Sequence, residues 1–169
     1  MRHQLYFEID IHFNVGPARV WDALTNPEKT KQYMYGCEIS SDWEIGSPVN
    51  WVGKLDGEST NVIIGTLLDV LPLKRLEMSV FPPGVGIPDI PENYVTMEYT
   101  LKRKMEGTVL HVRLGDYALV AGGEMRYADT VNVWTAVAPV LVKIAESSVP
   151  PKSDSNQGSV IDYVSKLKP

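Results

Sequence analysis

The sequence predicts an α+β fold in which one curved antiparallel β-sheet wraps around a long C-terminal helix. Two observations carry this prediction. Residues 124–147 form the long segment with helical periodicity, and a series of runs with strand-like patterning precedes it. Two short helical segments interrupt that series after the first strand. Strands grouped together, with a helix at the end, are typical of α+β domains.

The first strand is predicted between residues 4 and 15. Its apolar side chains recur at every second position, which is typical of a half-buried strand; they are Leu5, Phe7, Ile9, Ile11 and Phe13. Pro17 suits the first turn of a helix, where its missing N–H costs nothing, so a short helix is predicted from there to Leu24. Pro27 then begins a second short helix that ends near Tyr35.

The middle of the chain has the pattern of antiparallel strands joined by turns. Residues with high strand propensity alternate, and segments rich in glycine, proline or aspartate separate them. The predicted strands are 37–43, 49–53, 61–71, 75–81, 94–103 and 108–117.

The final helix should be buried along one stripe. Its apolar residues fall three or four positions apart; they are Trp134, Val137, Ala138, Leu141, Ile144 and Ala145. Pro139 lies inside this segment and predicts a kink. A stripe that begins with a tryptophan needs a large surface to pack against, and a twisted sheet would leave space between itself and the helix.

Two segments fall outside this pattern. Residues 82–93 contain Pro82, Pro83, Pro88 and Pro91, and predict a long connection without regular structure, of the kind that forms rims or lids. Composition turns polar after Pro151. The expected organisation is therefore one domain over residues 1–148 and a polar, partly disordered tail over 149–169.

Composition excludes several classes of function. The 169 residues carry 21 acidic and 16 basic side chains, a net charge of −5, so nucleic acid is not an expected partner. Cys37 is the one cysteine, which rules out an intrachain disulfide and favours a reducing cytoplasm. The sequence shows neither a signal peptide nor an uninterrupted apolar run of 18 residues, so no membrane association is expected.

A candidate ligand-binding set comes from bulky side chains expected between the sheet and the final helix. An apolar cavity with a few polar groups suits a hydrophobic small molecule. The alternative for each of these residues is ordinary core packing. The set is Trp51, Met97, Tyr99, Tyr127, Trp134, Val137 and Leu141.

Catalytic and metal sites are not predicted, and no cofactor is expected. His12 and His111 fall out of phase with the apolar faces of their strands, and the sequence lacks paired metal-ligand spacings. Cys37 has no histidine near it in the sequence and is expected to be a buried, idle thiol. Asp116, at the predicted end of the sheet, is a weak candidate for a functional group at a pocket mouth.

Three motifs give the chain a family resemblance. They are the segment from Pro17 to Pro27, the segment from Gly65 to Pro72 followed by Arg75 and Leu76, and Trp134 within a C-terminal helix. Together they resemble the START-like (SRPBCC, helix-grip) superfamily, in the branch of the activator-of-heat-shock-ATPase homologues. The resemblance implies the helix-grip fold over residues 4–147, and it leaves function open because this fold supports many activities.

The leading hypothesis is non-catalytic binding of an apolar or aromatic small molecule in a cavity between the sheet and the final helix. The first alternative is a protein-interaction module that regulates a chaperone-type ATPase, as the resemblance implies. The second alternative is a cyclase-like or hydrolase-like enzyme that uses the same cavity, which would require an ionisable group inside it.

Overall fold

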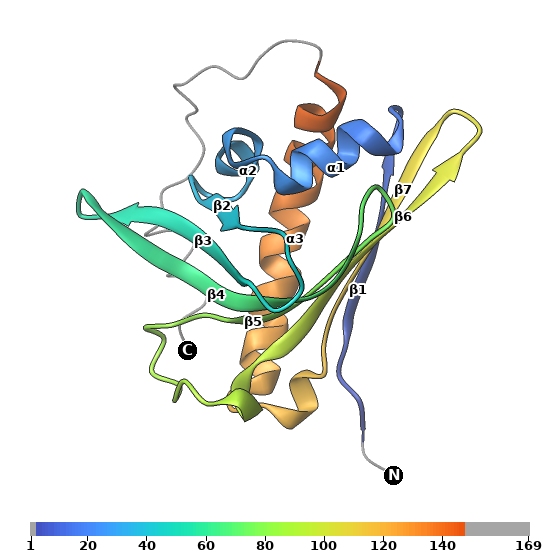
Figure 1. Ribbon diagram of the computed structural model, residues 1–169. Coiled ribbons are helices and arrows are strands. Elements are labelled where there is room, and N and C mark those ends of the chain that lie inside the picture. The colour runs from blue at the N-terminus through green and yellow to red at the C-terminus, as the bar shows by residue number, and fades with distance from the viewer. Residues whose placement is uncertain (1–2, 148–169) are drawn as a thin grey trace.

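The computed structural model describes residues 3–147 and confirms the predicted α+β architecture. Figure 1 shows one sheet that bends around the long helix α3 (Gly123–Glu146), with α1 (Pro17–Thr25) and α2 (Pro27–Tyr33) against one end of that helix. Seven antiparallel strands follow the order β1-β7-β6-β5-β4-β3-β2. The strands are β1 (Phe7–Phe13), β2 (Glu38–Ser41), β3 (Pro48–Leu55), β4 (Glu58–Leu71), β5 (Arg75–Phe81), β6 (Val95–Lys104) and β7 (Gly107–Gly115).

Alternation sets which face of each strand enters the core. In β6, Val95, Met97, Tyr99 and Leu101 are buried, whereas the residues between them are half-buried. The partner strand β7 buries Leu110, Val112 and Leu114 on the same side, and the register pairs Met97 with Leu114. The inner face of the sheet is therefore apolar, and the outer face carries the charged side chains.

Irregular pairing bends the sheet. The register between β3 and β4 shifts at Trp51 and Val52, and the register between β4 and β5 shifts between Leu67 and Asp69. An extra residue in one strand increases local twist and bends that strand. These shifts lie in the half of the sheet that curves around α3 (Figure 1).

The predicted stripe of α3 is confirmed. Trp134, Val137, Leu141, Ile144 and Ala145 are buried, and Ala138 is half-buried. The helix continues through Pro139, which lies on the exposed side. A proline removes the hydrogen bond to the carbonyl four residues earlier, here that of Thr135, which is also exposed, so water can satisfy this carbonyl.

Predictions of local structure differ from what is observed in several places. The strand predicted over 108–117 ends at Gly115, just before a turn of 3-10 helix. The strand predicted over 37–43 is shorter, because Trp43 adopts a left-handed φ of 59° that ends regular pairing after β2. The 82–93 connection is more ordered than predicted: it contains a short 3-10 helix, η1 (Pro91–Asn93), and it buries Val85 and Asn93. The predicted tail over 149–169 lies outside the described residues.

Two glycines shape the entry to α3, which follows a second 3-10 helix, η2 (Tyr117–Leu119). Gly122 has φ of 64°, a left-handed conformation that glycine adopts without strain. A Cβ on Gly123 would lie 1.8 Å from the carbonyl oxygen of Tyr117, so only glycine fits. The start of the helix backbone is therefore packed directly on η2.

Candidate functional site

An inner cavity of about 70 Å³ lies between the sheet and the N-terminal half of α3. Five strands supply its walls on one side, and α3, η2 and the segment after α2 supply the other. Most of the lining side chains are apolar. They are Met34, Trp51, Ile63, Val80, Phe81, Pro82, Val95, Met97, Leu114, Tyr117, Arg126, Thr130, Val133 and Trp134.

Three residues of the predicted ligand-binding set line this cavity: Trp51, Met97 and Trp134. Neither indole N–H of the two tryptophans has a hydrogen-bond acceptor within residues 3–147. A buried indole N–H normally finds a partner, and both indoles belong to residues of the lining, so each is a candidate donor to a polar ligand atom.

The other four residues of the set lie elsewhere. Tyr99 is buried beneath Trp134, with ring centroids 6.1 Å apart in an edge-to-face arrangement. Val137 and Leu141 are buried farther along α3, in the solid core. Tyr127 is half-buried and packs edge-to-face on Tyr117. Contact of any of these residues with a ligand stays a prediction.

Arg126 is the charged residue of the lining, and the sequence did not predict it there. Its side chain is 6% exposed, and its Nη1 donates a hydrogen bond to the carbonyl oxygen of Asn93 at 2.8 Å. The guanidinium carbon lies 6.0 Å from the ring centroid of Phe81 and 5.9 Å from that of Tyr117. Burial lowers the pKa of Arg126, which nevertheless remains a cation at neutral pH.

Two hydroxyl groups extend the polar side of the cavity. The hydroxyl of Thr130 donates to the carbonyl oxygen of Arg126 at 2.8 Å. The hydroxyls of Tyr117 and Thr130 lie 2.6 Å apart, so the Tyr117 hydroxyl is the donor in that pair. Burial raises the pKa of Tyr117, which keeps the phenol neutral. The Tyr117 oxygen is therefore left as an acceptor.

The sequence pattern that could have located the two polar lining residues of α3 is the apolar stripe of that helix, extended toward its N-terminus. Arg126 and Thr130 lie eight and four positions before Trp134, on the same side of α3. An arginine on an apolar stripe is easily assigned to the surface, and only the packing of 82–93 over this end of the helix shows that it is buried.

Asn93 fixes the 82–93 segment to the start of α3. Its side-chain oxygen accepts from the backbone N–H of Ala121 at 3.0 Å, and its side-chain nitrogen donates to the carbonyl oxygen of Pro88 at 2.9 Å. Its own carbonyl accepts from Arg126. In Figure 1 this segment, between β5 and β6, lies beside the N-terminal end of α3. One buried asparagine thus connects the rim of the cavity to the helix.

We expect the substitution Asn93→Ala to lower the free energy of unfolding by about 1–3 kcal/mol, because it removes two part-buried hydrogen bonds, one with the N–H of Ala121 and one with the carbonyl of Pro88. Chemical denaturation measures the change. Asn132→Ala, at an exposed position of α3, is the control and should change stability by less than about 0.5 kcal/mol. Equal effects for the two variants would contradict the role of Asn93.

The size of the cavity limits what this conformation holds. Pockets for drug-sized ligands measure roughly 300–1,000 Å³, whereas this cavity has room for roughly two or three water molecules. Met34 and Met97 are among its walls, and methionine side chains adapt to new shapes more readily than branched ones. A ligand larger than a few atoms requires these walls to move.

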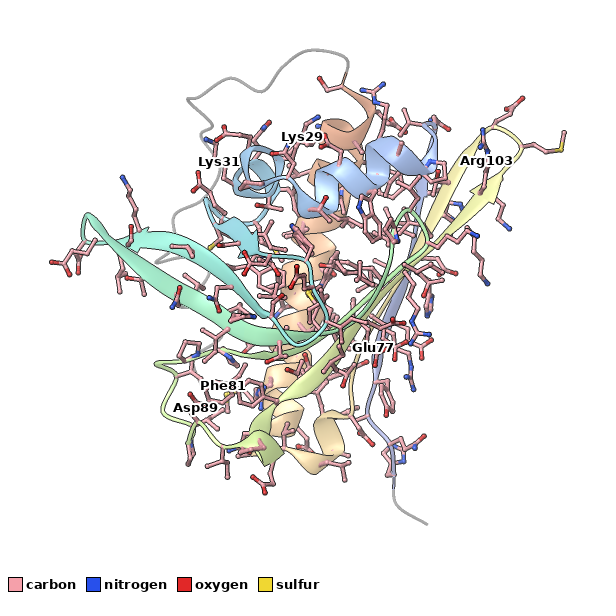
Figure 2. All side chains as sticks on the ribbon, viewed as in Figure 1. Lys29, Lys31, Glu77, Phe81, Asp89 and Arg103 are labelled. Carbon is pink, nitrogen blue, oxygen red and sulfur yellow. The ribbon has the colours of Figure 1, made fainter. Side chains whose placement is uncertain are left out.

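A second, open depression of about 510 Å³ lies on the outer face of the sheet. Glu77, labelled in Figure 2, and Glu98 line it together with Arg113. Its cation Arg113 is already paired: it lies near Glu8 and Glu98, and its guanidinium carbon is 3.7 Å from the ring centroid of Tyr6. Asp116 lines this depression rather than the inner cavity and accepts hydrogen bonds from the N–H groups of Leu5 and Ala118.

The remaining reactive side chains lie away from the inner cavity. Cys37 is buried, and burial raises its pKa to about 12, so the thiolate form is scarce. His12 is exposed, and His111 contacts Asp10 at 2.6 Å on the outer face. Within residues 3–147 no group of histidine, cysteine or carboxylate side chains has the arrangement of a metal site.

The helix α3 is long and apolar enough to span a membrane by length and composition alone. Within the described residues it packs instead against β1, α1 and α2, with its apolar stripe toward the sheet. The buried stripe of this helix thus belongs to the core of the domain.

Comparisons with known proteins support the observed fold. The family model described as "Activator of Hsp90 ATPase homolog 1-like protein" matches residues 14–146. The solution structure of ChR145 from Cytophaga hutchinsonii is 29% identical, with a TM-score of 0.69 over 86% of this chain and 97% of that chain. No curated protein sequence matches the chain.

Two further solved structures are similar in fold. An HSP90 activator from Plasmodium falciparum is 14% identical, with a TM-score of 0.64 over 83% of this chain and 94% of that chain. The Aha1 dimer from Colwellia psychrerythraea is 13% identical, with a TM-score of 0.59 over 85% of this chain and 99% of that chain. At these identities the likeness concerns the fold alone.

Proposed function

The chain belongs to the Activator of Hsp90 ATPase homolog 1-like family, and from that premise we propose that it is a non-catalytic domain that binds an apolar or aromatic small molecule in the inner cavity. The observation that carries the proposal is the lining itself. Trp51, Met97 and Trp134 face one space between the sheet and α3, and apolar side chains make up most of the remaining wall. Such a lining favours a ligand with an apolar body.

The ionisable groups of the lining support binding rather than catalysis. Among the described lining residues there is no histidine, carboxylate or cysteine, the usual general bases and nucleophiles. Arg126 is a permanent cation and Tyr117 a neutral phenol, so neither is suited to remove a proton near neutral pH. These groups can position a ligand, and that is the role we assign to them.

A thermal-shift screen with small neutral compounds, such as indole, toluene and cyclohexanol, tests the proposal. A ligand that binds the folded state alone raises the melting temperature, and at a concentration of about 100 Kd the stabilisation is about 2.7 kcal/mol. The matched control is Val133→Phe, which places a larger side chain into the cavity from α3. We expect the shift in the wild type and its loss in the control. The proposal fails if no compound raises the melting temperature and a crystal structure shows the cavity filled by side chains.

The second candidate function is regulation of a chaperone-type ATPase through a protein interface. Family membership favours it, since the family takes its description from an activator of the Hsp90 ATPase. We propose the 82–93 segment and the edge strand β2 as the contact surface; Ile90, in that segment, is 45% exposed. An ATPase assay with Hsp90 tests it: stimulation that Ile90→Asp abolishes supports this function, and an unchanged rate with the wild type removes it.

A further inference from the structure

We propose that the ligand of the inner cavity is a small carboxylic acid with an apolar body, and that Arg126 binds its carboxylate. This inference rests on the proposed binding function and adds the chemical class of the ligand. It stands on the position of Arg126, on the charges around it and on the size of the cavity.

The guanidinium of Arg126 is held with most of its donors uncommitted. A guanidinium carries five N–H groups, and the one hydrogen bond that the Arg126 side chain makes within residues 3–147 runs from Nη1 to the carbonyl oxygen of Asn93. The rings of Phe81 and Tyr117 lie about equally far from its carbon. The side chain is therefore fixed in place, and the planar fork that matches a carboxylate remains available.

This buried charge has no partner of opposite sign. Within residues 3–147, no carboxylate oxygen lies within 4.0 Å of Arg126. The carboxylate of Asp129, three positions later on α3, does not pair with Arg126 either. Its buried Oδ2 has no hydrogen-bond partner in the described part of the chain, and burial raises its pKa. A buried cation is costly when it is unpaired, so an anion that enters the cavity would gain both charge pairing and hydrogen bonds.

The other polar groups of the lining also favour an acceptor-rich ligand. The indole N–H groups of Trp51 and Trp134 are donors without acceptors, and the Tyr117 proton is committed to Thr130. Donors thus predominate among the free polar groups. A carboxylate offers two acceptor oxygens and one negative charge, which balances the single cation of the lining, whereas a phosphate dianion would leave an excess of buried charge.

The volume of the cavity limits the apolar body of the ligand. A space of about 70 Å³ is small even with adjustment of Met34 and Met97. A single ring or a short alkyl chain is therefore the expected size, and long-chain fatty acids and polycyclic acids are not.

Calorimetric titration of the full chain with matched pairs tests the inference: benzoate against benzamide, and hexanoate against hexanamide. The acids should bind roughly tenfold to a hundredfold more tightly than the amides, the range expected for hydrogen bonds to a charged group. Arg126→Met should remove this preference. Arg103→Met is the control, because Arg103 is exposed on the β6–β7 hairpin (Figure 2), so this variant loses the same charge and should keep the preference.

The outcomes separate this inference from the function on which it rests. Equal binding of acid and amide by the wild type overturns the carboxylate assignment and leaves the apolar binding function in place. No binding of acids, amides or the neutral compounds of the screen overturns both. If Arg126→Met does not fold, the wild-type comparison still decides, together with a bound structure that either places the carboxylate on Arg126 or places it elsewhere.

Discussion

Trp134→Ala should lower the free energy of unfolding by about 3–5 kcal/mol, the range for truncation of a large aromatic side chain in a core. Trp134 is buried on α3, packs edge-to-face against Tyr99 of β6 and lines the inner cavity. Its truncation would remove the edge-to-face contact between helix and sheet and enlarge a space that already exists. Guanidinium unfolding followed by circular dichroism measures the change.

The neighbouring position supplies the control for Trp134. Thr135 is exposed on the same helix, so Thr135→Ala should change stability by no more than about 0.5 kcal/mol. A loss below about 1 kcal/mol for Trp134→Ala, far under the usual cost of an aromatic truncation, would mean that the indole does not join helix to sheet.

Phe81→Ala is expected to have a similarly large effect, about 3–5 kcal/mol, for a different reason. Phe81 ends β5 beside the 82–93 segment, which contains Asp89 (Figure 2), and it is 1% exposed. Its ring stacks on Tyr94 at a centroid distance of 5.0 Å and lies on one side of Arg126. Its loss should therefore destabilise the domain and also loosen the cavity rim, which limited proteolysis between residues 82 and 93 would detect.

Tyr94→Phe is the matched control for the rim. It keeps the ring that stacks on Phe81 and removes the hydrogen bond from the Tyr94 hydroxyl to Asp89, which is exposed, so we expect a loss below about 1 kcal/mol. If Phe81→Ala lowered the free energy of unfolding as little as this control, the stacking of Phe81 on Tyr94 would not stabilise the rim. Asn93 would then be the residue that holds the rim in place.

Much of the fold could be predicted from the sequence because the strands and the helix have distinct periods. Alternation in β1 and β6 and the three-or-four spacing in α3 each assign a buried face without tertiary information. The end of β2 could not be predicted in this way. Trp43 favours a strand by propensity, and its left-handed backbone conformation results from local turn geometry instead.

The candidate site was predicted less completely, and the missing part is polar. The phase of the strands and of the helix was enough to predict Trp51, Met97 and Trp134 as lining residues, because a large apolar side chain at an inward position faces the space between the layers. Arg126 could not be predicted in this way, since its burial depends on the 82–93 segment lying over it. The prolines and glycines of that segment suggested a connection without structure, whereas Asn93 orders it through contacts with residues about 30 positions away in the chain.

The pairing of β1 with β7 has a consequence for how the chain comes to be folded in a cell. Leu5 and Asp116 are joined by a hydrogen bond across 111 positions, and α3 is made later still. On the ribosome, the hollow side of the growing sheet therefore stays uncovered until the last helix emerges, and contacts so distant along the chain form slowly. Until α3 is made, the apolar inner face of the sheet is therefore exposed to solvent, and exposed apolar surface of this kind favours aggregation.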